Sequence, residues 1–410
     1  MIFEAKLKVS KKQDLNIPST RRILFACCGA HIIQDGLAAL QYVLLPILAQ
    51  SFGLNYAQVG LLRALSNSAT SALEIPSGIL AERTGERRLV VLGLAAAGIG
   101  YLGVAVSSSF LLIAVFFFVT GIGGGFQHSL TSAVIVNSFN LGQRRRALGI
   151  YNASGDAGKL TFTGLFSLGI GAGFAWNTVV TVMGLVAIGF AGVVWILLSD
   201  TDRQRQAGEE ASLSGLSGRW GIKRPRQFGL LGMVVFLDSI VQAVFLTFLA
   251  FVLLQKDASA STASMAVVLA LAGGMTGKFC CGFLTARYGD QRPFLIIQLL
   301  TMVGIVGLIV MPATALLIAL PFIGLVVQGS STVTYGAISD HIRASHQSRG
   351  FALIYTLANA ASVVGPLVFG LIADHSGLDA AMWVLCGITA LTLPLGLVLG
   401  APMRDDIAKA

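Results

Sequence analysis

Charge and cysteine are both scarce in this sequence. Only 11% of the 410 residues are charged, against roughly 25% in an average soluble domain, which excludes a soluble globular protein and a disordered chain. The five Cys lie inside apolar runs without a C-x-x-C spacing, and this argues against disulfides and structural zinc. An ATP-binding motif, a metal-ligand cluster and a nucleophile–base set are also missing. We therefore expect no enzyme, no cofactor and no bound metal.

Apolar residues and glycine are abundant instead. Hydrophobic residues make up 55% of the chain and Gly accounts for 48 positions, a composition that predicts a polytopic helical membrane protein. The net charge of +9 would suggest nucleic acid for a soluble protein. In a membrane protein it follows from Lys and Arg gathered on the cytoplasmic side, so we expect no nucleic-acid partner.

Apolar stretches long enough to span a bilayer recur along the chain with short polar breaks. They predict twelve transmembrane helices, at 23–50, 57–82, 88–107, 109–137, 147–170, 173–198, 228–255, 261–286, 293–311, 313–336, 350–373 and 378–400. The long polar segment 199–227 is expected to be a cytoplasmic linker between two six-helix bundles, 23–198 and 228–400. The ends 1–22 and 401–410 are expected to be cytoplasmic tails, and the basic segment 1–22 does not resemble a cleavable signal.

Basic residues predict the orientation. With the N-terminus placed inside, 24 of the 28 Lys and Arg fall in cytoplasmic segments and only Lys256 falls in an external loop. The sequence therefore predicts a bacterial-type inner-membrane protein with both termini in the cytoplasm.

The two halves are related by an internal repeat. A shift of 204 residues aligns the segment 78–88 with 282–292, and the same shift aligns Tyr151 with Tyr355 and Gly125 with Gly329. One offset that serves three separate regions indicates two parallel six-helix repeats, related by an axis along the membrane normal.

The segment Gly78-Ile-Leu-Ala-Glu-Arg-Thr-Gly-Glu-Arg-Arg88 resembles the loop signature between helices 2 and 3 of the major facilitator superfamily. Its second copy, 282–292, matches as well. The resemblance implies an all-α fold of twelve helices in two six-helix bundles, transport by alternating access, and a monomer in the bilayer. Three further segments, 31–35, 121–128 and 370–375, look similar to the fosmidomycin-resistance-like branch of bacterial efflux proteins.

The loop signature has a physical interpretation. Gly78 and Gly85 allow close helix approach and a tight turn, and Glu82 and Arg83 are placed to pair with a neighbouring helix end in one conformation. On the resemblance, such a pair is a latch that holds the outward-open state; the alternative is that the basic residues only anchor the topology. The expected latch residues are Gly78, Glu82, Arg83, Gly85, Arg87, Gly282, Arg287 and Gly289.

Ionisable residues inside the membrane are the best functional pointers, because each costs about 2.5–3.5 kcal/mol at the bilayer centre. His31, Gln34 and Asp35 share one helix face near mid-bilayer. A His beside a carboxylate makes a proton site, and the alternative is a buried pair that only ties helices together. The residues expected to take part in proton coupling are His31, Asp35, Glu74 and Asp238.

The remaining polar residues are expected to line a central substrate cavity. Lys159 is expected to bind an anionic substrate with Asp156 as its switchable partner, unless the two form a permanent intrahelical pair. Because the 204 shift aligns Glu74 with Lys278, these two either pair across the cavity or pair within their own halves. Arg63 is either a gate residue or an interfacial anchor. The expected cavity residues are Gln34, Arg63, His128, Asp156, Lys159, Gln242 and Lys278.

These patterns favour a secondary transporter that exports a small anionic or zwitterionic compound or drug in exchange for protons. One alternative is an importer of a small organic anion. Another is a metalloid exporter, since the pairs Cys27-Cys28 and Cys280-Cys281 offer soft ligands. The glycine run at 121–125 follows no strand, so we expect it to serve helix packing rather than nucleotide binding.

Overall fold

A computed structural model describes residues 17–199, 222–336, 342 and 347–399. Helices account for nearly all of this part of the chain, and its only β contact is an isolated bridge between Ile222 and Ile342. The helices are α2 (Ile17–Phe52), α3 (Tyr56–Thr84), α4 (Glu86–Val106), α5 (Phe110–Gly125), α6 (His128–Ser138), α7 (Leu141–Gly171), α8 (Trp176–Leu197), α10 (Pro225–Gln255), α11 (Ala260–Tyr288), α12 (Gln291–Val310), α13 (Ala313–Gly336), α14 (Gln347–Ser376) and α15 (Leu378–Leu399). The tail 401–410, most of the tail 1–22 and most of the linker 199–227 lie outside the described residues.

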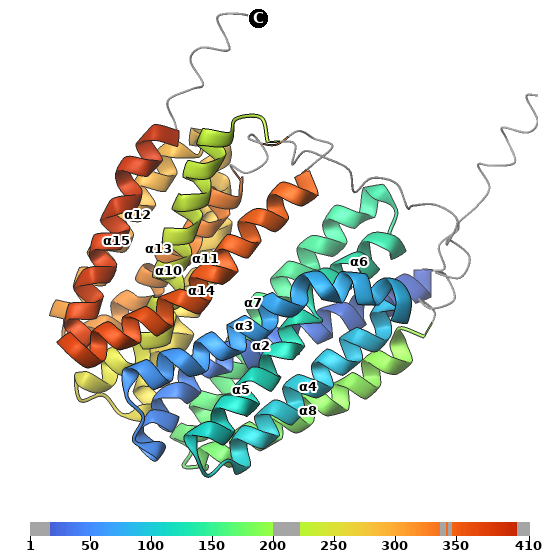
Figure 1. Cartoon of the computed structure of the whole chain (residues 1–410), viewed down its shortest axis with the longest axis horizontal. Coiled ribbons are helices and arrows are strands. Elements are labelled where there is room, and N and C mark those ends of the chain that lie inside the picture. The colour runs from blue at the N-terminus through green and yellow to red at the C-terminus, as the bar shows by residue number, and fades with distance from the viewer. Residues whose placement is uncertain (1–16, 200–221, 337–341, 343–346, 400–410) are drawn as a thin grey trace, which may run out of the picture.

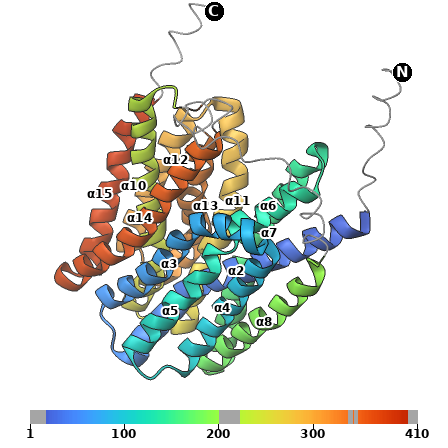
Figure 2. The same cartoon turned by 45° about the vertical axis from the view of Figure 1, so that its right-hand side comes forward.

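The helices form two groups, α2–α8 and α10–α15, which come together at one end and diverge toward the other (Figures 1 and 2). With α5 and α6 counted as one interrupted helix, each group has six members, and the twelve-helix prediction is confirmed. The helix ends differ by a few residues from the predicted spans: α2 begins at Ile17 and α10 at Pro225.

Ten of the helical segments in the described residues are long and apolar enough to cross a membrane by length and composition. The helices α3 and α7 are long enough but fall outside this set. They are more polar than the others because α3 carries Arg63 and Glu74, and α7 carries Asp156 and Lys159. The two helices with the weakest membrane signal therefore each carry two charged residues into the middle of the fold, whereas α2, α10 and α11 carry one each there, Asp35, Asp238 and Lys278.

The predicted continuous helix over 109–137 is wrong in one respect, because the structure interrupts it at Phe126 and Gln127. The glycine run before this break packs against neighbouring helices, as expected. A Cβ atom on Gly121 would lie 2.1 Å from the Ser66 carbonyl oxygen in α3. Consecutive glycines weaken a helix, which explains why it breaks here and restarts at His128.

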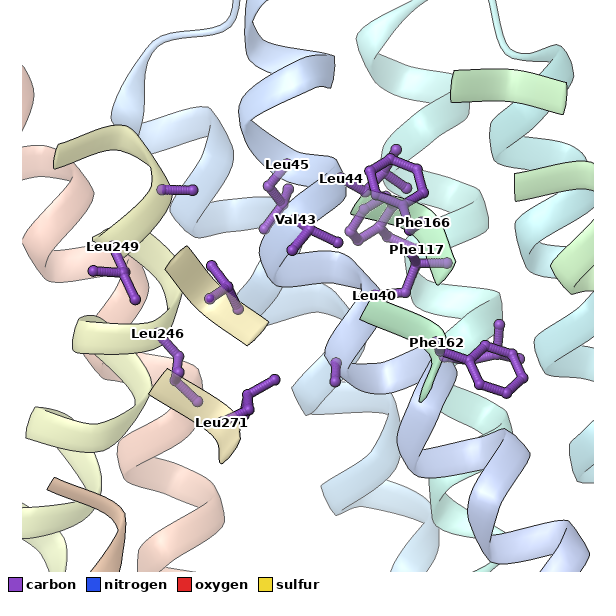
Figure 3. Close-up of a cluster of buried hydrophobic side chains, with 14 of the residues drawn as sticks. Leu40, Val43, Leu44, Leu45, Phe117, Phe162, Phe166, Leu246, Leu249 and Leu271 are labelled. Atoms are coloured by element: carbon purple, nitrogen blue, oxygen red, sulfur yellow. The ribbon is translucent and has the colours of Figure 1, made fainter. Parts of the chain in front are cut away.

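The largest buried apolar cluster extends through both groups of helices, and two smaller clusters lie within the second group. Figure 3 shows Phe117, Phe162 and Phe166 of α5 and α7 on one side of α2, with Leu246 and Leu249 of α10 on the other. The helix α2 therefore contributes to the core of its own group and to the contact with the second group.

The crossing of α2 and α7 depends on glycine. A Cβ atom on Gly158 would lie 2.1 Å from the Ile32 carbonyl oxygen, whereas one on Gly164 of the same helix would meet nothing within 4 Å. We expect Gly158→Ala to lower the melting temperature of the purified protein, because the backbones must separate. Gly164→Ala is the matched control and should leave it unchanged or raise it, since Ala favours helices over Gly by about 1 kcal/mol. Equal melting temperatures for the two variants would contradict this.

Candidate functional site

The two groups of helices are clamped together where α3 begins and α14 ends. The N–H groups of Tyr56 and Ala57 each donate to the Asp374 carboxylate at 2.8 Å. The next amide, that of Gln58, donates to the Asn55 side chain in a capping box. The first amides of a helix have no partner within the helix, so a carboxylate from the opposite group satisfies two of them and also meets the positive end of the helix dipole. We call this contact the closed-end clamp.

Close backbone approach reinforces the closed-end clamp. A Cβ atom on Gly60 would lie 2.2 Å from the Pro366 carbonyl oxygen, and one on Gly370 would lie 2.3 Å from that of Tyr56. The ring of Tyr56 packs edge-on against Phe251 of α10, with centroids 5.6 Å apart. Further along α3, Asn67 Nδ2 donates to the Ser362 carbonyl oxygen at 2.7 Å. The two groups are therefore in contact from the start of α3 to its middle.

We expect Asp374→Ala to loosen the closed end. A helix-capping carboxylate contributes about 1 kcal/mol, which corresponds to about a fivefold shift in a two-state equilibrium. The measurement is the distance between spin labels at the exposed starts of α8 (Asn177) and α15 (Asp379) in a cysteine-free background, and longer distances should gain population. Asp257→Asn, a change to an exposed acidic residue in the loop after α10, is the control. An unchanged distance distribution in Asp374→Ala would mean that the clamp does not hold this end.

The expected latch residues lie at the opposite, open end. Glu82 and Arg83 are exposed there, and nothing in the described residues pairs with either side chain. The glycines at the two turns behave as expected: Gly85 has a φ of 86° and Gly289 a φ of 73°. Gly78 makes no close helix approach, since a Cβ atom there would meet nothing within 4 Å, and in this respect the prediction is wrong.

Two other expected latch residues, Arg87 and Arg287, contact aromatic rings. A third, Gly282, makes no close helix approach. The Arg87 guanidinium lies over the Trp195 ring of α8 at 3.9 Å, and the Arg287 guanidinium lies 5.6 Å from the Tyr288 ring. A Cβ atom on Gly282 would reach only Thr332, at 3.9 Å.

Asp35 is the centre of a cluster of charged side chains near the middle of the molecule. Its side chain is only 10% exposed, and its Oδ2 atom lies 3.1 Å from Lys159 Nζ. The Nε2 atom of His31 lies 3.5 Å from Oδ2, and that of His128 lies 3.6 Å from Oδ1. The break before α6 places His128 here, because α6 begins at this residue. The structure therefore brings together residues that the sequence assigned separately to proton coupling and to substrate binding.

The cluster continues across to the second group of helices. Lys159 Nζ also lies 3.1 Å from Asp156 Oδ1, so the expected intrahelical pair is present, but the same ammonium group is shared with Asp35. Lys278 Nζ of α11 donates to both oxygens of Asp156, at 2.7 and 3.0 Å. We call this set the ion network; it consists of His31, Asp35, His128, Asp156, Lys159 and Lys278.

Glu74 and Lys278 do not pair with each other, and neither pairs within its own half. The Glu74 carboxylate accepts a hydrogen bond of 2.8 Å from Asn359 Nδ2 of α14, whereas Lys278 contacts Asp156 of α7. Both alternatives that the repeat suggested are therefore wrong for this conformation. The 204 shift relates equivalent positions of the two halves, but α3 packs against α14 and α11 packs against α7, so Glu74 and Lys278 lie in different helix pairs.

Asp238 and Gln242 lie apart from the ion network, inside the second group of helices. The Asp238 carboxylate accepts hydrogen bonds from Gln298 at 2.7 Å, Gln242 at 2.8 Å and Ser330 at 2.9 Å. It is 3% exposed, and within the described part of the chain every donor to it is neutral. This arrangement joins α10, α12 and α13, and no sequence pattern pointed to Gln298 or Ser330 as partners.

Two residues that the sequence analysis did not assign to the site shape it. The Nδ1–H group of His31 donates to the Tyr151 carbonyl oxygen at 2.8 Å, and the two rings are stacked with centroids 4.1 Å apart. A Cβ atom on Gly155 would lie 2.6 Å from the His31 ring and 2.8 Å from Asp35 Oδ2. Tyr151 orients the imidazole and Gly155 leaves space for it. The only signal for Tyr151 was its repeat at Tyr355.

Two cavities adjoin the ion network. The first, of about 110 Å³, lies between the two groups of helices and is lined by Tyr42, Asp156, Lys159, Leu246, Leu271, Gly274, Met275, Lys278 and Gln328. The second, of about 150 Å³, lies within the first group, and Gln34, Asp35, Arg63 and His128 are among its lining residues. Glu74, Asp238 and Gln242 line neither cavity. Of the expected cavity residues, six of seven border one cavity or the other.

Comparison with known proteins agrees with this architecture. The model of the Major Facilitator Superfamily matches residues 27–253 and 231–408. The chain is 24% identical over 390 residues to the uncharacterized MFS-type transporter YfnC of Bacillus subtilis (strain 168), covering 91% of this chain and 92% of YfnC. It is 21% identical over 378 residues to the hexuronate transporter of the same organism, covering 86% and 88%.

A solved structure is also similar. A bacterial homologue of the human lysosomal transporter Spinster, in an inward-facing and occupied conformation, superposes with a TM-score of 0.77 at 16% identity, covering 93% of this chain and 97% of that chain. These proteins are named as transporters and not as enzymes. The chain is therefore a multi-pass membrane protein and a secondary transporter that belongs to the Major Facilitator Superfamily.

Proposed function

We propose that this protein transports a small organic anion together with a proton. The observation that carries the proposal is the sharing of the Lys159 ammonium group between Asp35 and Asp156. A proton on Asp35 removes one of the two charges that hold Lys159. The lysine, on the wall of the first cavity, is then available to an anion. Proton binding and anion binding therefore favour each other, which is the condition for moving both in the same direction.

The geometry around His31 supports a proton site. A carbonyl oxygen can only accept, so the contact with Tyr151 keeps the hydrogen of a neutral imidazole on Nδ1. The Nε2 lone pair then faces Asp35 Oδ2 at 3.5 Å, an unfavourable approach that a proton on either group relieves. The space between Nε2 of His31 and Oδ2 of Asp35 is therefore the position that we propose for the transported proton.

The proposed orientation places the open end in the cytoplasm, because the basic loop after α3 lies there and 24 of the 28 Lys and Arg were assigned to that side. The proposal includes cytoplasmic tails and a cytoplasmic linker between the bundles, as in a bacterial inner membrane. In this orientation the closed-end clamp seals the external side and the described conformation opens inward. The hexuronate transporter among the relatives carries an organic anion, and this supports the substrate class.

Export is the second candidate. The likeness of segments 31–35, 121–128 and 370–375 to the fosmidomycin-resistance-like branch favours it, with a phosphonate-like drug leaving in exchange for protons. The ion network suits this anion as well, since Lys159 and Lys278 both border the first cavity. The two candidates differ in whether protons and the anion move together or in opposite directions.

The test uses purified protein in liposomes that contain a pH-sensitive dye. A panel of small organic acids, including fosmidomycin, is added outside without an imposed gradient. Proton co-transport predicts that an acid entering the vesicle acidifies the lumen, and that an imposed inside-alkaline gradient accelerates uptake. Alkalinisation on entry would instead support exchange and overturn co-transport. Absence of any acid-dependent proton movement, with folded protein confirmed by melting, would overturn proton coupling.

A further inference from the structure

Arg63 is a buried cation without a counter-charge in the described residues. Its residue exposure is 7%, and its guanidinium donates to the Ala38 carbonyl oxygen, to Gln41 and to the Tyr42 hydroxyl. All three acceptors are neutral. Every other Lys or Arg of the described helix interiors, Lys159 and Lys278, contacts a carboxylate. An unpaired charge at this depth is costly, so its presence indicates a use.

Two residues that line the second cavity, Arg63 and Gln34, each have a buried polar atom without a hydrogen-bond partner in the described structure. The Nε atom of Arg63 is buried and lacks a partner in the described structure, and so does Oε1 of Gln34, whose side chain lines the same cavity and is 4% exposed as a residue. Ser66 and Thr120 also line it, and their hydroxyl groups accept from Gln41 Nε2, at 2.9 and 3.2 Å. Buried polar atoms are nearly always hydrogen-bonded, so two residues with unpaired atoms in the lining of one cavity point to a polar ligand there.

The two cavities are neighbours. Tyr42 lines the first cavity and its hydroxyl accepts a hydrogen bond of 2.6 Å from Arg63, which lines the second. Asp35 lines the second cavity and lies 3.1 Å from Lys159 of the first. A ligand that reaches from Lys159 toward Arg63 therefore stays within one polar region around Asp35.

We propose that Arg63 is a second anion-binding position, and that the substrate is a small organic dianion with an acidic group at each end. This inference rests on the proposed function for the first acidic group, at Lys159 and Lys278. The second acidic group accepts from the Arg63 guanidinium, whose contacts with Gln41 and Tyr42 hold it in place. Gln34 donates an Nε2–H group to the same end of the substrate, because a carboxylate can only accept.

The test compares ligands and variants in one binding assay. Purified protein in detergent is titrated with straight-chain dicarboxylates of four to seven carbons and with monocarboxylates of matched length. The ratio of the two dissociation constants is the readout. In the wild type, dicarboxylates should bind about 10- to 100-fold more tightly, the value of a hydrogen-bonded charge pair. Arg63→Gln should remove most of this preference and leave monocarboxylate binding nearly unchanged.

Further variants separate binding from folding. Arg63→Gln also loses three hydrogen bonds, so Gln34→Leu serves as the second variant. It removes an amide whose Oε1 atom is buried without a partner in the described structure, so it should raise the melting temperature of the free protein. It should still reduce the dicarboxylate preference several-fold. Lys256→Gln removes a cation that donates to the Ile309 carbonyl oxygen, and it is the control.

The outcomes distinguish the inference from the proposed function. A dicarboxylate preference that Arg63→Gln removes supports the dianion assignment. Equal affinity for both ligand series, or a preference that survives in both Arg63→Gln and Gln34→Leu, overturns the second anion position and leaves the proposed function intact. Absence of binding by either series to folded wild-type protein overturns both.

Discussion

Replacing Asp35 with Asn is expected to abolish proton-driven accumulation of substrate, with a loss of about 100-fold or more in initial rate. The Asn amide cannot take up a proton. Because it is neutral, it also no longer competes with Asp156 for the ammonium group of Lys159, whose Nζ atom lies 3.1 Å from Asp35 Oδ2 and 3.1 Å from Asp156 Oδ1 in the wild type. The link between proton and anion is therefore cut. Downhill exchange of substrate across the membrane should continue, because Asn occupies nearly the same volume and Lys159 keeps Asp156 as a partner.

The measurement compares two modes in the same liposomes: uptake driven by an imposed pH gradient, and counterflow exchange without one. Asp257→Asn is the control, since that carboxylate is exposed in a loop. The assignment fails if Asp35→Asn still concentrates substrate at the wild-type rate. Loss of both modes together, with an unchanged melting temperature, would show that Asp35 serves substrate passage rather than coupling.

Lys159→Gln is expected to raise the substrate dissociation constant by about 100-fold while lowering the melting temperature only slightly. In the ligand-free state Lys159 holds two carboxylates, Asp35 and Asp156. The variant leaves Asp156 with Lys278, at 2.7 Å, and leaves Asp35 beside His128, whose Nε2 atom lies 3.6 Å from Oδ1. The substrate, by contrast, loses its charged contact on the side of α7.

The competing account makes Lys159 a permanent structural tie between α2 and α7. Under that account Lys159→Gln destabilises the protein and leaves affinity for substrate unchanged. Binding and melting measured on the same purified sample decide between the two. Lys256→Gln again serves as the control for loss of a positive charge, and it should change neither quantity by more than a small amount.

Hydropathy and charge predicted the fold well because a bilayer leaves few solutions for a long apolar chain. The twelve helices, the repeat and the turn glycines Gly85 and Gly289 all followed from local pattern. The break before His128 was missed because hydropathy does not register where a glycine-rich helix loses its hydrogen-bond ladder. Charged residues in α2, α7 and α11 were visible in the sequence as costly exceptions, and Asp35, Asp156, Lys159 and Lys278 among them belong to the ion network.

Pairings between distant side chains were beyond the sequence. The bridge from Asp156 to Lys278 and the contact of Asp374 with the start of α3 join residues from opposite halves, at distances set by how the halves tilt. The repeat offset relates equivalent positions but does not specify which helices of the two halves meet, and α3 packs against α14 whereas α11 packs against α7. Glu74 consequently met Asn359 instead of Lys278.

The two repeats contribute unequally to the ion network. The second half of the chain supplies only Lys278 to the network among the described residues, and the positions that correspond to Arg63, Asp156 and Lys159 by the 204 shift are Val267, Ala360 and Val363. The first repeat therefore supplies most of the charged groups of the ion network, and the second repeat supplies one basic contact to it. We therefore expect substrate preference to depend mainly on residues of the first repeat, and substitutions in the second repeat to change it less.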